Sequence, residues 1–248
     1  SLAARAAGDG YTVLVTTTSV VVNPALYDNP GYELARELVP VIEIATSANV
    51  IAAHPGFGAK TLAEAIEKAR SGQASFGSPG NGSTSHLTGE YLLNSVSKAD
   101  VRHVPYRGGA LAVADTLGGQ TPLVVVPVPV AAQHVKAGTL VPLAVTSVQR
   151  YPGWPEVATV AESGFPGYVD ATWVGAFAPA GTPAAIVDTL NRKIAAALAR
   201  DEVRARLVAA GLEPRGGAAA DFGAYVRDEV ARWKAVVEKT GVKAEQGS

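Results

Sequence analysis

The sequence contains neither cysteine nor methionine among its 248 residues. Without cysteine there can be no disulfide bond, thiolate nucleophile or cysteine-ligated zinc, and the chain suits any redox compartment, including an oxidising one. Because the initiator methionine is absent, we expect that the chain is not an intact primary translation product. Its first residues, Ser1–Arg5, read as the end of an amphipathic helix rather than as a signal peptide.

Charge and long apolar runs are also scarce. Only 17% of the residues are charged, and the formal net charge of −1 gives no electrostatic case for binding nucleic acid or an anionic membrane surface. The longest apolar candidate, Leu123–Ala132, is about half of the roughly 20 residues that a membrane-spanning helix needs, and it holds two prolines. We therefore expect no direct membrane insertion. With 48% apolar residues, the chain can build a real core in one large domain or two modest ones.

Strand-like and helix-like segments alternate through the first two thirds of the chain. The helix predicted over Leu62–Ala69 carries the clearest local signals, because Thr61 caps it, Glu64 completes a capping box and Gly72 stops it. The predicted strands are 11–16, 41–44, 49–53, 74–77, 101–104, 123–126 and 140–146. One further helix is predicted after the glycine-rich stretch that follows residue 77, ending near residue 96, and another is predicted over 110–117. These repeated units predict an α/β fold with a largely parallel sheet.

The last third is predicted to be helical. Before it, Tyr151–Pro183 is rich in proline, glycine and aromatic residues, which indicates a linker-like crossing segment. Thr182 and Pro183 then have the pattern of a helix cap followed by proline at the first helical position. Further helices are predicted over Asp201–Ala210 and Asp221–Lys239, with Asp221, Glu229 and Lys234 on a solvated face.

A glycine-rich loop, Gly77–His86, lies between a predicted strand and a predicted helix. A Walker-type phosphate loop needs a lysine that this loop lacks, and the nucleophile elbow Gly-x-Ser-x-Gly lacks its closing glycine. A dyad of Ser85 with His86 also fails, because neighbouring helical residues point about 100° apart. A serine hydrolase using Ser83 or Ser85 remains the alternative from another functional class.

The same loop suits an anion. The first four N–H groups of a helix have no intrahelical partner, and small residues let a carboxylate approach them. Asn81–Ser85 therefore describe a carboxylate site without formal positive charge, although an ordinary capped helix after a tight turn explains them equally well. Two more donor-rich loops, Pro105–Gly109 and Thr16–Ser19, also follow predicted strands, and ligands of open α/β sheets bind at such strand ends.

Several motifs occur together in the order and spacing of one family. They are DGYTVLVTTTS, NPALY, SFGSPGNGSTSHLTGEYL, HVPYRGG, DTLGGQ, HVKAGTLVPLAVTS, PEVATVAESGFPGY and WVGAFAPAGTP. Over essentially its whole length the chain resembles the substrate-binding receptors of tripartite tricarboxylate transporters, called Bug proteins in Bordetella and its relatives. Each motif alone is modest, and the eight in register make the resemblance specific.

The resemblance implies a type II periplasmic binding protein whose two α/β lobes close on a small organic carboxylate or dicarboxylate. It implies lobe 1 over 1–50, lobe 2 over 51–171, and a return to lobe 1 over 172–248. Such a receptor is periplasmic, uses no cofactor or metal, performs no chemistry and delivers its ligand to the permease subunits of the transporter. Presentation of the ligand to a sensor kinase is the alternative within the binding class.

Carried over by position, the resemblance also implies the ligand-binding residues. They are Ser78, Asn81, Gly82, Ser83, Thr84 and Ser85 on one carboxylate, Tyr106, Gly108 and Gly109 in the same lobe, and Thr17, Thr18 and Ser19 from the first lobe. Trp173, beside the return crossing, is expected to pack at the hinge or to touch the ligand.

The chain departs from the family pattern at two places. Roughly fifty N-terminal residues, the size of a βαβ unit, are missing relative to the family, so we expect the first strand and helix of lobe 1 to be absent. Val126 and Pro127 stand where the family often carries Asp-Asn, an acid able to receive a ligand ammonium. An apolar wall there predicts a ligand without an amine, because a buried ammonium would lose its counter-ion.

The four histidines are not expected to bind a metal ion. His54, His86, His103 and His134 are scattered along the sequence, and no pair shows ligand spacing with a nearby carboxylate. We expect His86, one turn inside the candidate anion helix, to pack or hydrogen-bond locally.

Overall fold

The computed structural model describes residues 2–27, 29–72 and 74–241. The chain divides into two compact units, which are described separately here. Unit 1 comprises the residues up to Thr46 together with Trp173–Val237, which include most of the last helix, and unit 2 comprises Ser47–Thr172 and the last described residues, from Glu238. Among the described residues, no helix combines the length and the apolar character needed to cross a membrane.

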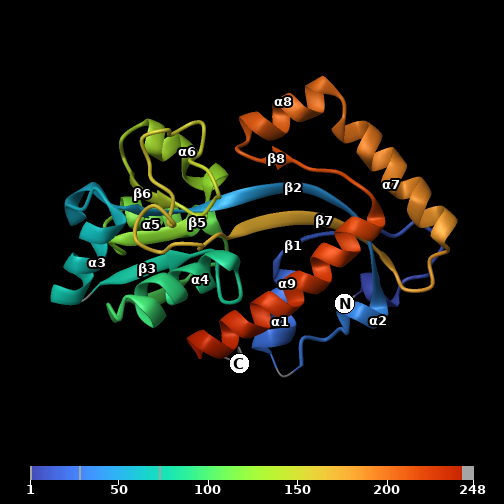
Figure 1. Ribbon diagram of the computed structural model, residues 1–248, viewed down its shortest axis with the longest axis horizontal. Coiled ribbons are helices and arrows are strands. Elements are labelled where there is room, and N and C mark those ends of the chain that lie inside the picture. The colour runs from blue at the N-terminus through green and yellow to red at the C-terminus, as the bar shows by residue number, and fades with distance from the viewer. Residues whose placement is uncertain (1, 28, 73, 242–248) are drawn as a thin grey trace. The chain divides into compact units, whose positions relative to one another are not determined.

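Unit 2 is built on a mixed sheet (Figure 1). Its strands are the second part of β2 (Leu38–Ala53), β3 (Ser75–Ser78), β4 (Arg102–Pro105), β5 (Leu123–Pro127) and β6 (Val141–Val145). β3 runs parallel to β4 and to β5, whereas β2 pairs antiparallel with β5 and with β6. The predicted parallel arrangement therefore holds around β3, and the strand that enters from unit 1 pairs in the opposite direction.

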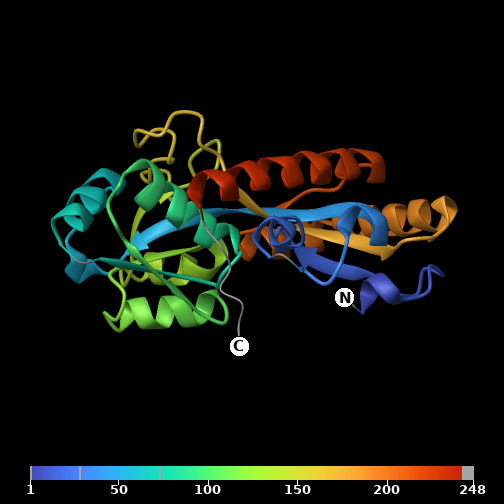
Figure 2. The same ribbon diagram turned by 90° about the horizontal axis from the view of Figure 1, so that it is seen from below.

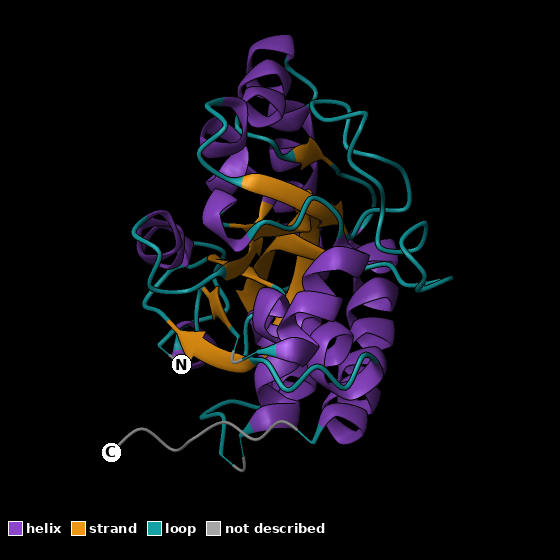
Figure 3. Cartoon of the chain, turned by 90° about the vertical axis from the view of Figure 1, so that its left-hand side faces the viewer, coloured by secondary structure: helices purple, strands orange, loops and turns teal. Residues whose placement is uncertain are grey.

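Alternating residues of these strands feed two separate cores, one on each face of the sheet. Ile51 and Val125 point into a core with Leu62 and Ile66 of helix α3 (Leu62–Ser71). Their neighbours along the strands, such as Val124, point instead into a core with the helices α5 (Gly109–Leu117) and α6 (Val128–Lys136). Figures 2 and 3 show helices on both sides of these strands. Because successive side chains of a strand point to opposite faces of the sheet, each continuous apolar strand contributes residues to both cores.

The helices of unit 2 follow mostly local signals. Thr61 caps α3 as predicted, since its hydroxyl accepts a hydrogen bond from the Glu64 N–H at 3.2 Å. The helix after the glycine-rich loop consists of α4 (Thr84–Gly89) and a directly following π-helical segment, Glu90–Val96. Short 3₁₀ turns cover Ala3–Arg5 in unit 1 and Pro55–Phe57 in unit 2.

Unit 1 combines an antiparallel sheet with long helices. Its elements are β1 (Leu14–Thr17), α1 (Ser19–Leu26), α2 (Leu34–Glu37), the first part of β2, β7 (Ala171–Pro179), α7 (Ala184–Leu198), α8 (Asp201–Ala209), β8 (Glu213–Pro214) and α9 (Ala219–Thr240). β1 pairs antiparallel with β7, and β8 pairs antiparallel with β2. Val41, Ile42, Ala176 and Ala178 form the sheet side of a core closed by α7 and α8.

Three predictions about elements need correction. The two short strands predicted over 41–44 and 49–53 belong to one 16-residue strand, β2, because no glycine or proline interrupts the chain between them. The crossing segment over Tyr151–Pro183 contains the nine-residue strand β7. Thr182 does not cap α7, since its hydroxyl donates to the Pro179 carbonyl at 2.8 Å and the helix starts after Pro183.

Candidate functional site

The glycine-rich loop makes a tight turn at the end of β3 in unit 2. Gly80 has φ of 136° and Gly82 has φ of 77°, backbone angles that residues other than glycine rarely adopt. A Cβ atom on Gly80 would also lie 2.9 Å from the Tyr106 carbonyl oxygen, in the neighbouring loop. The two glycines thus let the chain reverse direction and present the start of α4 at the strand ends.

Ser83 is the N-cap of α4. Its hydroxyl accepts a hydrogen bond from the His86 N–H at 3.1 Å and donates to the Gly80 carbonyl at 2.8 Å. The Leu87 N–H is satisfied by the Ser83 carbonyl. Within the part of the chain that the structure describes, the N–H groups of Thr84 and Ser85 have no acceptor. Two donors at the positive end of the helix dipole are therefore left without an intrahelical partner.

The hydroxyls of Thr84 and Ser85 are used inside the protein. Ser85 donates to the Asn49 side-chain oxygen at 2.8 Å, and the Asn49 amide donates to Thr84 Oγ1 at 3.3 Å and to Asp170 at 3.0 Å. Thr84 Oγ1 is also hydrogen-bonded to Thr172 Oγ1. Both residues are almost fully buried, so their hydroxyls hold α4 in position through these hydrogen bonds.

The second strand-end loop of unit 2 lies directly beside the first. The Tyr106 N–H donates to the Ser78 carbonyl at 3.1 Å, and the Gly108 N–H donates to the Pro79 carbonyl at 3.0 Å. Partial burial, together with a hydrogen bond to Asp115, raises the pKa of Tyr106 to about 12, so this hydroxyl stays protonated at neutral pH. Gly109 begins α5, which therefore starts next to the glycine-rich turn.

The remaining predicted residues are placed as follows. Asn81 is exposed in the turn, and Gly82 is buried. Ser78 is fully buried, and its hydroxyl pairs with the Nε2 atom of His103 at 2.7 Å. Val126 is fully buried in β5, where it packs in the core shared with α5 and α6.

In unit 1, the predicted residues lie where β1 passes into α1. Thr17 and Ser19 are hydrogen-bonded to each other at 3.2 Å. Thr18 is buried, and it exchanges two hydrogen bonds with the backbone of Trp173, one through its hydroxyl and one through its N–H. Trp173 is itself fully buried, and its indole N–H donates to Glu229 at 3.2 Å. Thr18 and Trp173 thus join β1 to β7.

Glu229 contradicts the predicted solvated face of α9. It is only 4% exposed and accepts hydrogen bonds from Trp173, Trp233 and Arg232. A sequence pattern of exposed charge cannot reveal partners on a distant strand.

Among the described residues, neither Ser83 nor Ser85 is hydrogen-bonded to a group that could act as a general base. Ser83 is used as a helix cap, and Ser85 donates to Asn49. The His86 ring accepts instead from the Gly82 N–H at 3.3 Å through Nδ1, which confirms the predicted local hydrogen bond. A general base must reach the proton that it abstracts, and no imidazole does so here among the described hydrogen bonds.

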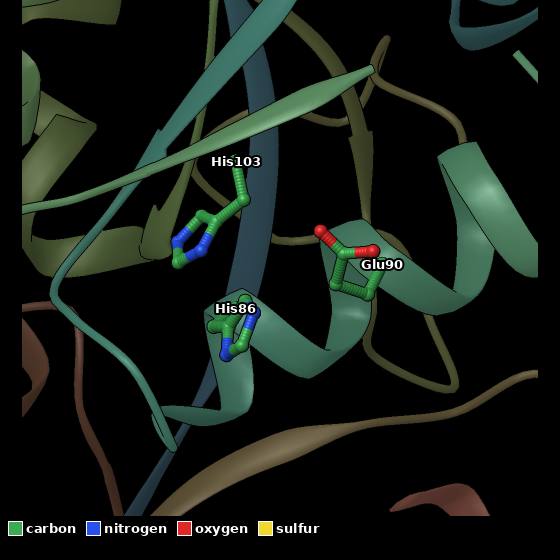
Figure 4. A group of neighbouring side chains, drawn as sticks. All are labelled: His86, Glu90 and His103. Atoms are coloured by element: carbon green, nitrogen blue, oxygen red, sulfur yellow. The ribbon is translucent and has the colours of Figure 1, made fainter. Parts of the chain in front are cut away.

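The prediction that the histidines are scattered is wrong for two of them. The rings of His86 and His103 are stacked, with centroids 3.9 Å apart, and Glu90 lies beside them (Figure 4). Each of the three side chains offers a nitrogen or oxygen atom within 4.8 Å of the others. The sequence held a partial signal, because His86 and Glu90 are four residues apart and so share one face of a helix.

Sequence reasoning also missed Asn49 and Asp170. Both are buried, and Asp170 additionally accepts a hydrogen bond from the Thr88 hydroxyl at 2.6 Å. Thr146 joins the same network by donating to the Asp170 carbonyl at 2.6 Å. A polar residue inside an apolar strand, as at Asn49, is the only sequence signal for this network.

Residues 1–242 match the family described as "Tripartite tricarboxylate transporter family receptor". A relative from Pseudomonas sp. (strain P51), described as a UPF0065 protein in the tcbD-tcbE intergenic region, is 34% identical over 99% of this chain and 74% of its own length. Protein BugT of Bordetella pertussis is 33% identical over 97% of this chain and 74% of its own length.

Solved structures show the same likeness. A protein of R. palustris solved with adipate has a TM-score of 0.91 at 34% identity, over 98% of this chain and 82% of its own. The periplasmic binding protein BugD has a TM-score of 0.90 at 31% identity, with the same coverage. MatC from Rhodopseudomonas palustris with bound malate has a TM-score of 0.85 at 28% identity, over 95% of this chain and 82% of its own.

Proposed function

This chain belongs to the tripartite tricarboxylate transporter receptor family, and from that premise we propose that it captures a small organic carboxylate in the periplasm and presents it to the permease subunits of such a transporter. The family is one of receptors, and its relatives of known structure are periplasmic binding proteins. Two of these relatives carry adipate and malate, which are both dicarboxylates.

One observation supports the carboxylate site more than any other. Among the described residues, the Thr84 and Ser85 N–H groups at the start of α4 have no acceptor, and the hydroxyls beside them are hydrogen-bonded to Asn49. The helix would not have to rearrange when a carboxylate binds to these N–H groups, because the Ser83 cap and the buried Asn49 network already hold it in place. Binding then shifts the receptor toward a closed form by its differential affinity for that form.

The proposed ligand carries no amine. Where the family often carries Asp-Asn, this chain has Val126 and Pro127, and neither side chain could pair with a ligand ammonium. We therefore propose a dicarboxylate such as adipate, malate or succinate rather than an amino acid. Succinate and aspartate make a matched pair of probes, since they differ only by the ammonium group.

A pair of variants at one position tests the amide contact. Thr84→Pro removes the N–H, and proline is well tolerated at the first position of a helix. Thr84→Ala removes the same hydroxyl and keeps the N–H. Because a hydrogen bond to a charged group contributes about 1.5–3 kcal/mol, we expect Thr84→Pro to bind the best dicarboxylate about 10- to 100-fold more weakly than Thr84→Ala in calorimetry.

Equal affinities of the two variants would show that the start of α4 is not the carboxylate site. The wider proposal is tested by thermal shift of the unmodified chain. A bound ligand at 100 times its Kd adds about 2.7 kcal/mol of stability, so a true ligand raises the melting temperature clearly. Stabilisation by aspartate but not by succinate would overturn the proposed ligand class, and no response to any dicarboxylate would overturn the function.

A further inference from the structure

We propose that His86, Glu90 and His103 form a binding site for one divalent transition-metal ion, such as Zn²⁺, within unit 2. His86 and Glu90 project from successive turns of the helix that starts at Thr84, and His103 comes from β4 (Figure 4). One ligand atom from each lies within 4.8 Å of the others. Two imidazoles and one carboxylate are a ligand set that holds Zn²⁺ in proteins while leaving a fourth position open.

Each of the three side chains has one polar atom fixed by a neighbour and one left over. His103 pairs with the Ser78 hydroxyl through Nε2, which leaves Nδ1. Glu90 accepts from the Asn94 amide through Oε2 at 2.8 Å, which leaves Oε1. His86 pairs with the Gly82 N–H through Nδ1, which leaves Nε2. The partners of His103 and Glu90 are of the kind that orient metal ligands, whereas the Gly82 N–H holds His86 only in its present tautomer.

The charge state of the cluster also suits a cation. Burial lowers the pKa of His86 to about 4, and burial together with the nearby His86 lowers the pKa of His103 to about 3. Both rings are therefore neutral at pH 7, as metal ligation requires. Burial raises the pKa of Glu90, and among the described ion pairs no lysine or arginine neutralises this carboxylate. A metal ion would supply the missing positive charge.

Two rearrangements accompany binding. The rings now lie nearly parallel, at 16°, so they must tilt out of the stack for both lone pairs to meet one ion. The proton on His86 must move to Nδ1 when Nε2 binds the metal, which releases the Gly82 N–H. The helix changes to π geometry at Glu90, and such segments occur often at functional sites because they reposition side chains.

The test uses the full chain, stripped of metal with a chelator and then dialysed into a buffer without carboxylates. Titration calorimetry with Zn²⁺ should show one equivalent bound. Glu90→Gln and His103→Gln should each weaken binding at least 10-fold, with far-UV circular dichroism checking that each variant is folded. The control is the double variant His54→Ala/His134→Ala, because these two histidines line one surface cavity of about 460 Å³ and could bind metal by themselves.

The site is overturned if the control loses the binding or if both cluster variants keep it. X-ray absorption of the Zn²⁺-loaded unmodified chain gives a result that does not depend on any variant folding. We expect the Zn²⁺ ion to be surrounded by two imidazole nitrogens and by oxygen ligands. A shell of oxygen alone, or with a single imidazole, contradicts the proposal. Because no carboxylate ligand is present in either measurement, failure here leaves the receptor function unaffected.

Discussion

Two carboxylates on helices of different units are satisfied in very different ways. In unit 1, Glu229 on α9 accepts two indole N–H groups and a close hydrogen bond from Arg232 at 2.7 Å. In unit 2, Glu90 accepts one hydrogen bond from Asn94, and its pKa is raised by burial. Glu229 thus has both indole and guanidinium partners, whereas Glu90 has no lysine or arginine partner among the ion pairs of the described residues.

The partners of each carboxylate determine what that group is suited to do. A buried charge with its partners in place fixes neighbouring elements, and here it joins α9 to β7 through Trp173. A partly buried carboxylate beside two neutral imidazoles is costly until a proton or a metal ion reaches it. Stability measurements can therefore separate the two roles.

The largest effect is expected from Glu229→Ala. Removing this carboxylate leaves the two indole N–H groups and the Arg232 guanidinium without their acceptor, and breaking a buried charge pair in this way lowers the free energy of unfolding by about 3–5 kcal/mol. Urea unfolding monitored by circular dichroism measures the loss. The control is Asp228→Ala, an exposed neighbour on the same helix, which should change stability by less than about 0.5 kcal/mol. Equal losses in the two variants would contradict the structural role.

A smaller effect should appear when the pH falls. The pKa of His86 is lowered from 6.5 to about 4, so its contribution is complete above pH 6.5 and is lost as the pH falls toward 4. Between pH 7 and pH 5, the unmodified chain with chelator present should lose about 2 kcal/mol more than His86→Gln. Urea midpoints at the two pH values measure this difference, and a substitution at the partly exposed His134, His134→Gln, should follow the unmodified chain.

The smallest effect, and the one that changes sign, is expected from Glu90→Gln. Because the pKa of Glu90 is raised in the fold, the unmodified chain loses stability as the pH rises from about 4.5 through that pKa. With chelator at pH 7, the variant should be as stable as the unmodified chain or more stable by about 1 kcal/mol. With excess Zn²⁺ the order should reverse. A variant that is less stable than the unmodified chain under both conditions would show that Glu90, like Glu229, stabilises the fold without a metal ion.

The sequence predicted local structure better than it predicted which distant strands and side chains contact one another. The cap at Thr61 and the helix after the glycine-rich loop depend on neighbouring residues, and both are present in the structure. Helix α6 was not predicted, although its Pro129 lies in the first turn, where proline is compatible with a helix. The antiparallel pairing of β2 could not be read locally, since it depends on where distant strands meet.

The candidate site shows the same division. The donor-rich composition of Asn81–Ser85 could be read directly, and the family resemblance extended it to other loops. The use of Thr84 and Ser85 hydroxyls by Asn49 could not be read, because it joins residues that are 35 and 36 positions apart. The His86–His103 stack likewise depends on β3 and β4 lying side by side in parallel.

The shared hydrogen bonding of Glu229 has an optical consequence. Of the three tryptophans in the chain, Trp173 and Trp233 donate to the same carboxylate oxygen, at 3.2 and 3.0 Å. Any ligand that shifts β7 changes the electric field on Trp173 directly. The emission of Trp173 would therefore report such a shift in real time without an attached dye.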